Sequence, residues 1–106
     1  MIDKSAAVST LLGRLGNLPE GHCLEIRTYK RNRRVLFRRE ASDSWSALQE
    51  GFERNLHQGI ARDKLRKLLQ SLLRKEFPRS VKIRVYARGP CSPEEMQGPG
   101  PIERGT

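Results

Sequence analysis

Three short segments alternate apolar with cationic or tyrosine side chains, and this alternation constrains the fold most. Successive side chains of a β-strand point to opposite faces, so each segment has one apolar and one basic face. The clearest case is segment 81–88, where valine, isoleucine and alanine alternate with lysine, arginine and tyrosine. Segments 24–29 and 34–38 follow the same pattern, except that Glu25 and Leu36 fall on the basic faces and Thr28 on an apolar face. We predict three strands whose basic faces merge into one surface if they share a sheet.

This predicted basic surface supplies the candidate ligand contacts. Arginine and lysine neutralise phosphates, and a tyrosine on a strand face can stack on a base or cover neighbouring arginine stems. The connection between the first two strands, residues 30–34, carries four positive charges and is either a solvated turn or an anion contact. The candidate nucleic-acid-binding residues are Arg27, Tyr29, Lys30, Arg31, Arg33, Arg34, Arg38, Lys82, Arg84, Tyr86 and Arg88.

The positive charge is concentrated in the central part of the chain. The 106 residues suffice for one domain and carry a formal net charge of +9. Residues 22–88 hold 18 Lys and Arg against 7 Asp and Glu, whereas residues 1–21 are neutral and residues 89–106 are net acidic. Charge by itself is compatible with plain solubility. Its concentration in the folded part favours nucleic acid or another polyanion as the partner.

The remaining elements complete an α+β prediction. Helical spacing of apolar residues predicts helices over residues 4–15 and 61–76. A third helix is expected near residues 45–56, where Trp45, Leu48, Phe52 and Leu56 recur at helical spacing and Gly51 either costs stability or marks close packing. We therefore predict a two-layer sandwich of a three-stranded sheet with two amphipathic helices on one face, in the order α-β-β-α-α-β.

Three regions follow from this pattern. Residues 1–21 are expected to form a short N-terminal helix and linker, and residues 22–88 the basic α+β domain. Residues 89–106 are rich in Gly, Pro and Glu and are predicted to be a disordered tail.

The predicted order of elements over residues 4–88 resembles that of prokaryotic-type KH domains, which bind RNA. That family carries a G-x-x-G motif between its two central helices, whereas the corresponding stretch here reads Gln58-Gly59-Ile60-Ala61-Arg62. Because only one of the two glycines is present, no binding residue of that family is transferred to this chain.

Catalytic and metal chemistry have little support. The only histidines, His22 and His57, show no triad spacing, and the carboxylates are interspersed with arginines that they are expected to pair with. Neither a P-loop nor a G-x-G-x-x-G motif occurs. Cys23 and Cys91 lie far apart outside any metal-binding spacing, so we expect no metal and no cofactor.

No secretory signal or membrane-spanning run is visible in the sequence. We therefore expect a cytoplasmic protein with reduced thiols and no membrane partner, although a single disulfide is left open.

Two functions from different classes fit the sequence. The first is a small nucleic-acid-binding module. RNA is favoured over duplex DNA, because a sheet face with aromatic rings suits unstacked bases and no helix-turn-helix is apparent. The alternative is a protein-interaction or assembly module that docks an acidic partner or forms a homodimer through a sheet edge, with the last strand as the candidate edge. An enzyme is not expected.

Overall fold

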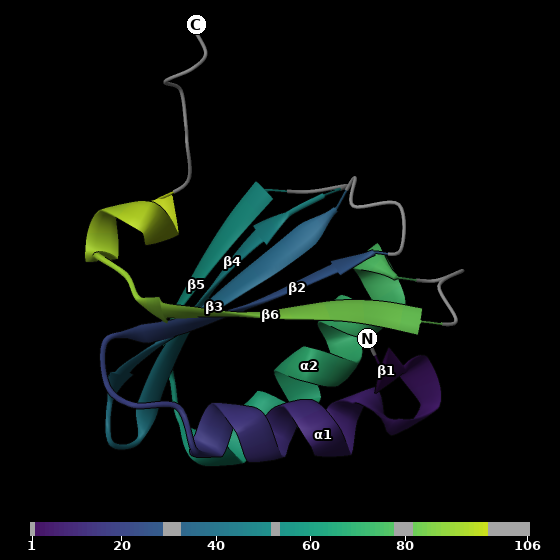
Figure 1. Cartoon of the computed structure of the whole chain (residues 1–106), viewed down its shortest axis with the longest axis horizontal. Coiled ribbons are helices and arrows are strands. Elements are labelled where there is room, and N and C mark those ends of the chain that lie inside the picture. Colours follow the sequence, from purple (N-terminus) through teal and green to yellow (C-terminus); the bar gives the residue numbers. More distant parts are fainter. Residues whose placement is uncertain (1, 29–32, 52–53, 78–81, 98–106) are drawn as a thin grey trace, which may run out of the picture.

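The computed structural model describes residues 2–28, 33–51, 54–77 and 82–97, which form a six-stranded antiparallel sheet with two helices against one face (Figure 1). The strand order is β1-β6-β2-β3-β4-β5. We call the face against the helices the inner face and the opposite one the outer face. The elements are β1 (Ile2–Asp3), α1 (Lys4–Gly16), β2 (His22–Thr28), β3 (Arg34–Ala41), β4 (Ser44–Glu50), β5 (Arg54–Ile60), α2 (Arg62–Glu76), β6 (Lys82–Pro90) and the 3-10 helix η1 (Pro93–Gln97).

The predicted three-stranded sheet and its α-β-β-α-α-β order are wrong. The segment expected to be the central helix forms most of β4 and the beginning of β5, two antiparallel strands. In β4 the residues Trp45, Ala47 and Gln49 on the inner face alternate with Ser46 and Leu48 on the outer face, and all five are buried. This period of two is hard to see in the sequence because a small and a polar residue share the inner face with Trp45. The resemblance to KH domains loses its basis, since it depended on that central helix.

The helices predicted over residues 4–15 and 61–76 are confirmed as α1 and α2. Their apolar stripes pack on the inner face, where burial of leucine, isoleucine and phenylalanine side chains stabilises the fold by roughly 1.5–3 kcal/mol each. The N-terminal segment, expected to be a separate helix and linker, contributes to this same core, and β1 pairs with β6. The largest core side chains are Leu11, Leu15, Leu24, Ile26, Phe37, Trp45, Leu65, Leu69, Leu72, Phe77 and Ile83.

Trp45 joins the sheet to both helices. Its ring is fully buried, and its Nε1 donates a hydrogen bond of 3.0 Å to the carbonyl of Leu15 at the end of α1. The guanidinium groups of Arg39 and Arg62 lie 4.9 and 5.2 Å from the ring centre. The sequence-based reading of Trp45 as a core residue holds. Leu56, grouped with it in the sequence, is instead 39% exposed on β5, and Phe52 lies outside the described residues.

A buried polar network lies at the edge of the core, between β4, β5 and the end of α2. The Gln49 side chain donates from Nε2 to the fully buried Glu76 carboxylate at 2.6 Å, and its Oε1 lies 3.2 Å from Nε2 of His57. Gly51 follows β4 directly against this network. A Cβ at Gly51 would lie 1.9 Å from Oε1 of Glu76, so close packing explains the glycine.

We predict that Gly51→Ala lowers the free energy of unfolding by about 1–3 kcal/mol, because the added methyl group displaces a buried, hydrogen-bonded carboxylate. Urea unfolding followed by circular dichroism measures the change. The matched control is Gly13→Ala in α1, where nothing lies within 4 Å of the added atom. That substitution should raise stability by about 0.5–1 kcal/mol. An unchanged midpoint for Gly51→Ala would contradict the prediction.

Candidate nucleic-acid interface

The outer face of the sheet gathers the basic side chains of the three predicted strands. β2 lies between β3 and β6, so the strands predicted from the alternating pattern are neighbours. In this register Glu25 stands opposite Leu36 and Tyr86, and Arg27 stands opposite Arg34 and Arg84. Predicted site residues brought together on the outer face are Arg27, Arg34, Arg38, Lys82, Arg84, Tyr86 and Arg88.

The other four predicted residues either lie outside the described part of the chain or, in the case of Arg33, contact another element. Tyr29, Lys30 and Arg31 lie outside the described residues. Arg33 turns toward the helical layer, where its Nη1 donates to the carbonyl oxygen of Glu76 at 3.1 Å. A cation at the carboxyl end of α2 complements the negative end of the helix dipole, so the role of Arg33 in the structure is to cap this helix.

A buried carboxylate organises the centre of the outer face. Glu25 has no exposed surface, although it lies on the face without helices. Its Oε2 is 2.6 Å from Nε of Arg27 and 3.3 Å from Nη1 of Arg34, and its Oε1 is 3.2 Å from Nη1 of Arg88. Three guanidinium groups from β2, β3 and β6 therefore converge on one carboxylate.

This convergence follows from the cost of burying charge. A carboxylate removed from water costs several kcal/mol unless cations and hydrogen bonds replace the lost hydration. Oε1 of Glu25 is close enough to Arg88 for an ion pair but has no hydrogen-bond partner of good geometry among the described residues. Burial lowers the pKa of Arg34, but its hydrogen bond and charge interaction with Glu50, together with those to Glu25, outweigh burial and raise that pKa above its usual value.

Carboxylates pair with cations elsewhere on the face as well. Glu50 contacts Arg34 and lies 3.8 Å from Arg54 across the β4–β5 hairpin, and Asp3 of β1 lies 2.7 Å from Nζ of Lys82. The prediction that acidic residues pair with arginines is confirmed for Glu25, Glu40 and Glu50, whereas Glu53 lies outside the described residues and the Glu76 carboxylate accepts a hydrogen bond from Gln49. The outer face is consequently a network of ion pairs in which cations outnumber carboxylates, and its positive charge is weaker than the sequence suggests.

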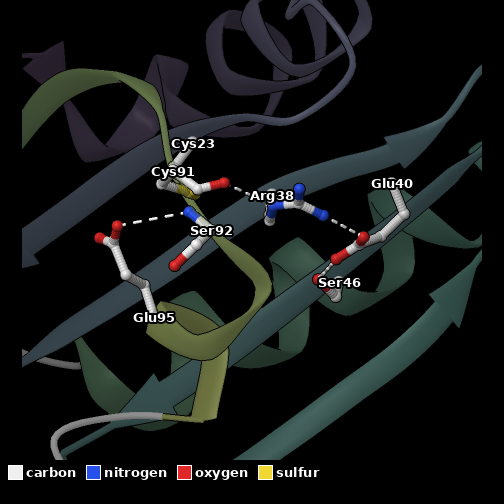
Figure 2. The surroundings of a disulfide bond; sticks show 7 residues. All are labelled: Cys23, Arg38, Glu40, Ser46, Cys91, Ser92 and Glu95. Carbon is white, nitrogen blue, oxygen red and sulfur yellow. Dashed lines mark hydrogen bonds and ion pairs between the residues drawn. A yellow bond between two sulfur atoms is a disulfide. The ribbon is translucent and has the colours of Figure 1, made fainter.

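The chain itself covers one end of the outer face. Cys23 of β2 is joined by a disulfide to Cys91, which follows β6 (Figure 2). The chain continues from Cys91 into η1, whose Met96 is buried against Leu36 and Leu48. This covering explains the leucine on a basic strand face. Gly89 and Pro90, assigned to the disordered tail by the sequence pattern, belong to β6, and residues 98–106 lie outside the described part.

Arg38 serves this covered end. Its Nε donates to the carbonyl oxygen of Cys91 at 3.0 Å, and its Nη1 pairs with Glu40, which also accepts a hydrogen bond from Ser46 (Figure 2). Only 13% of its side chain is exposed. Arg38 therefore holds the segment after β6 in place and is less exposed than Arg27, Arg34 and Arg88.

No protein-family model matches this chain, and neither the curated proteins nor the solved structures contain a significant match. Neither described helix has the length and hydrophobicity to cross a membrane. Within the described ranges no three His, Cys, Asp or Glu side chains form a group that could hold a metal ion. The expectation of reduced thiols is wrong in this structure, because Cys23 and Cys91 form a disulfide, a bond typical of oxidising compartments. The cytoplasmic location stays a prediction.

We predict that replacing both cysteines, Cys23→Ala with Cys91→Ala, lowers the free energy of unfolding by about 2–4 kcal/mol. The bond spans 68 positions of sequence and restricts the unfolded chain accordingly. Guanidinium unfolding measures the loss, and the wild type treated with dithiothreitol should show the same loss. Equal midpoints for oxidised wild type and the double variant would refute the prediction.

Glu25→Gln should lower the free energy of unfolding by about 2–3 kcal/mol, because a neutral amide removes the negative charge on which three guanidinium groups converge. Thermal and urea unfolding measure this change. Asp3→Asn is the control, since it removes a carboxylate from the exposed pair with Lys82 and should cost less than about 1 kcal/mol. The central role of Glu25 fails if the two substitutions have equal effects.

Proposed function

We propose that this protein is a small nucleic-acid-binding module, with RNA favoured, that binds through the outer face of its sheet. The observation that carries the proposal is the convergence of Arg27, Arg34 and Arg88 on buried Glu25. This arrangement fixes guanidinium groups side by side on a face that neither helix covers. We propose no catalytic role.

The paired arginines keep donors for a ligand. A guanidinium group has five N–H donors, so a group that contacts Glu25 can also donate to phosphate oxygens. The side chains of Arg27 and Arg88 are 31% and 50% exposed, so part of each guanidinium group is open to solvent. Holding the groups in place beforehand lowers the entropy lost when a phosphate binds. Because cations are in excess on this face, it attracts polyanions.

Tyr86 supplies the feature that distinguishes nucleic acid from other polyanions. It lies opposite Glu25 in the β2–β6 register, half-buried between the outward residues Arg84 and Arg88 of its own strand. An aromatic ring flanked by cations suits a stacked base whose neighbouring phosphates contact the arginines. This combination favours single-stranded RNA over a folded acidic protein as the ligand.

We expect single-stranded RNA to bind with a strong salt dependence, with a slope of about −3.5 to −4.5 in log affinity against log salt if ~5 phosphates are contacted. Tyr86→Ala should weaken binding by about 5- to 150-fold, the effect of losing one stacked base at about 1–3 kcal/mol. Tyr86→Phe keeps the ring and should bind like the wild type. Fluorescence anisotropy measures both quantities. A slope near zero, or equal affinities for all three proteins, would contradict the proposal.

One observation favours the alternative function, an assembly module. β5 is an edge strand, and its Leu56 is the only exposed large hydrophobic side chain among the described residues. The last strand, expected from the sequence to be the edge, lies between β1 and β2, but β1 pairs only with its residues Lys82 and Ile83. In this alternative self-association would use β5, the edge strand that carries Leu56. A concentration-dependent dimer in size-exclusion chromatography that ignores RNA would support this alternative.

A further inference from the structure

The helical side of the molecule carries cations without ionic partners. α2 contains six lysines and arginines and two acidic residues, of which Glu76 is buried. Arg62 lies over Trp45 and 3.9 Å from Asp43. In contrast, no ion pair within the described ranges involves four other α2 cations, all of them exposed. They are Lys64, Arg66, Lys67 and Arg74.

The spacing of these charges costs helix stability. Lys64 and Lys67 are three residues apart, and Arg62 and Arg66 are four apart, so like charges are neighbours on the helix surface. Each such pair destabilises a helix by about 0.2–0.5 kcal/mol, and an ordinary solvated face interleaves acidic residues that remove the repulsion. Only Asp63 does so here. A bound polyanion would relieve the repulsion.

A groove lies beside these cations. It lies between α1 and α2, has a volume of about 530 Å³ and is lined by Val8 and Leu73 together with Lys4, Gln70 and Arg74. The Nζ of Lys4 donates to the carbonyl of Phe77, which holds this amine beside the groove. Lys67 and Arg74 follow one stripe of α2 along it, because residues seven apart lie on the same side of a helix.

We propose that the exposed side of α2, with the adjoining groove, is a second surface for the phosphate backbone of nucleic acid, so that one molecule holds two RNA segments on opposite sides. The 15 residues of α2 extend about 22 Å, the length of about six nucleotides spaced at 3.4 Å. The apolar stripe of α2 is buried in the core, so this basic helix has no apolar face to insert into a lipid surface. The choice of RNA as the occupant rests on the proposed function.

Stoichiometry with a short probe tests this inference. A fluorescent oligouridine of about eight nucleotides is within the site size of one small module and is too short to follow both sides. The helix variant carries Lys64→Gln, Lys67→Gln and Arg74→Gln, and the sheet variant carries Lys82→Gln, Arg84→Gln and Arg88→Gln. Both lose three positive charges, so a difference between them reports location and not net charge. Circular dichroism verifies that each variant is folded.

We expect the wild type to bind two oligonucleotides at protein concentrations well above the dissociation constant, and each variant to bind one. Binding to the helix variant should still weaken on Tyr86→Ala, whereas binding to the sheet variant should not. One oligonucleotide on the wild type and an unchanged affinity for the helix variant would overturn the inference and leave the proposed function intact. Binding that is lost only in the helix variant would overturn the sheet site and retain the α2 surface. If the wild type binds one oligonucleotide and both variants bind it with equally reduced affinity, the loss reflects net charge, and this result would also overturn the inference.

Discussion

The ion pairs around Glu25 are the interaction on which the outer face of the sheet depends. A carboxylate with no exposed surface sits in the central part of a six-stranded sheet, on the side without helices. It is kept there by guanidinium groups from its own strand and from both neighbouring strands. Without those groups the buried charge would be strongly unfavourable, and without the carboxylate the arginines would repel one another. The burial of Glu25 and the arrangement of these arginines therefore depend on each other.

The molecule has two basic sides that differ in kind. On the outer face, arginines are largely engaged by carboxylates and by the segment after β6, so they offer positioned donors and modest net charge. On α2, several cations have no counter-charge in the described parts of the chain and offer long-range attraction. Positioned donors with an aromatic ring suit the recognition of bases and individual phosphates, whereas unpaired cations accelerate encounter with a polyanion. The two proposals assign these roles to opposite sides of one small domain.

The alternation in β2, β3 and β6 and the leucine stripe of α2 could be predicted from the sequence. In these segments most apolar residues face the core and most polar residues do not, so the pattern shows which side is buried. The central helix was mispredicted for an equally local reason. Trp45, Leu48 and Leu56 recur at helical spacing, but they belong to two strands and to different faces. Gln49 obscured the period-two pattern of β4, because it is a polar residue on the inner face. Its burial is favourable only because its side chain has hydrogen-bonding partners in Glu76 and His57. The sequence around Gln49 does not predict that these two residues contact it.

The sequence alone determined that this chain is strongly basic, that two amphipathic helices form, and that three alternating segments carry arginines on one face, because these properties depend on neighbouring residues. Only the tertiary structure decided how much of that charge is free to act. Whether an arginine meets a carboxylate depends on strand register, and the register of β2 against β3 and β6 brings residues more than sixty positions apart within about 3 Å. The disulfide and η1 cover one end of the outer face. This covering also could not be predicted from neighbouring residues, because it depends on contacts between distant segments.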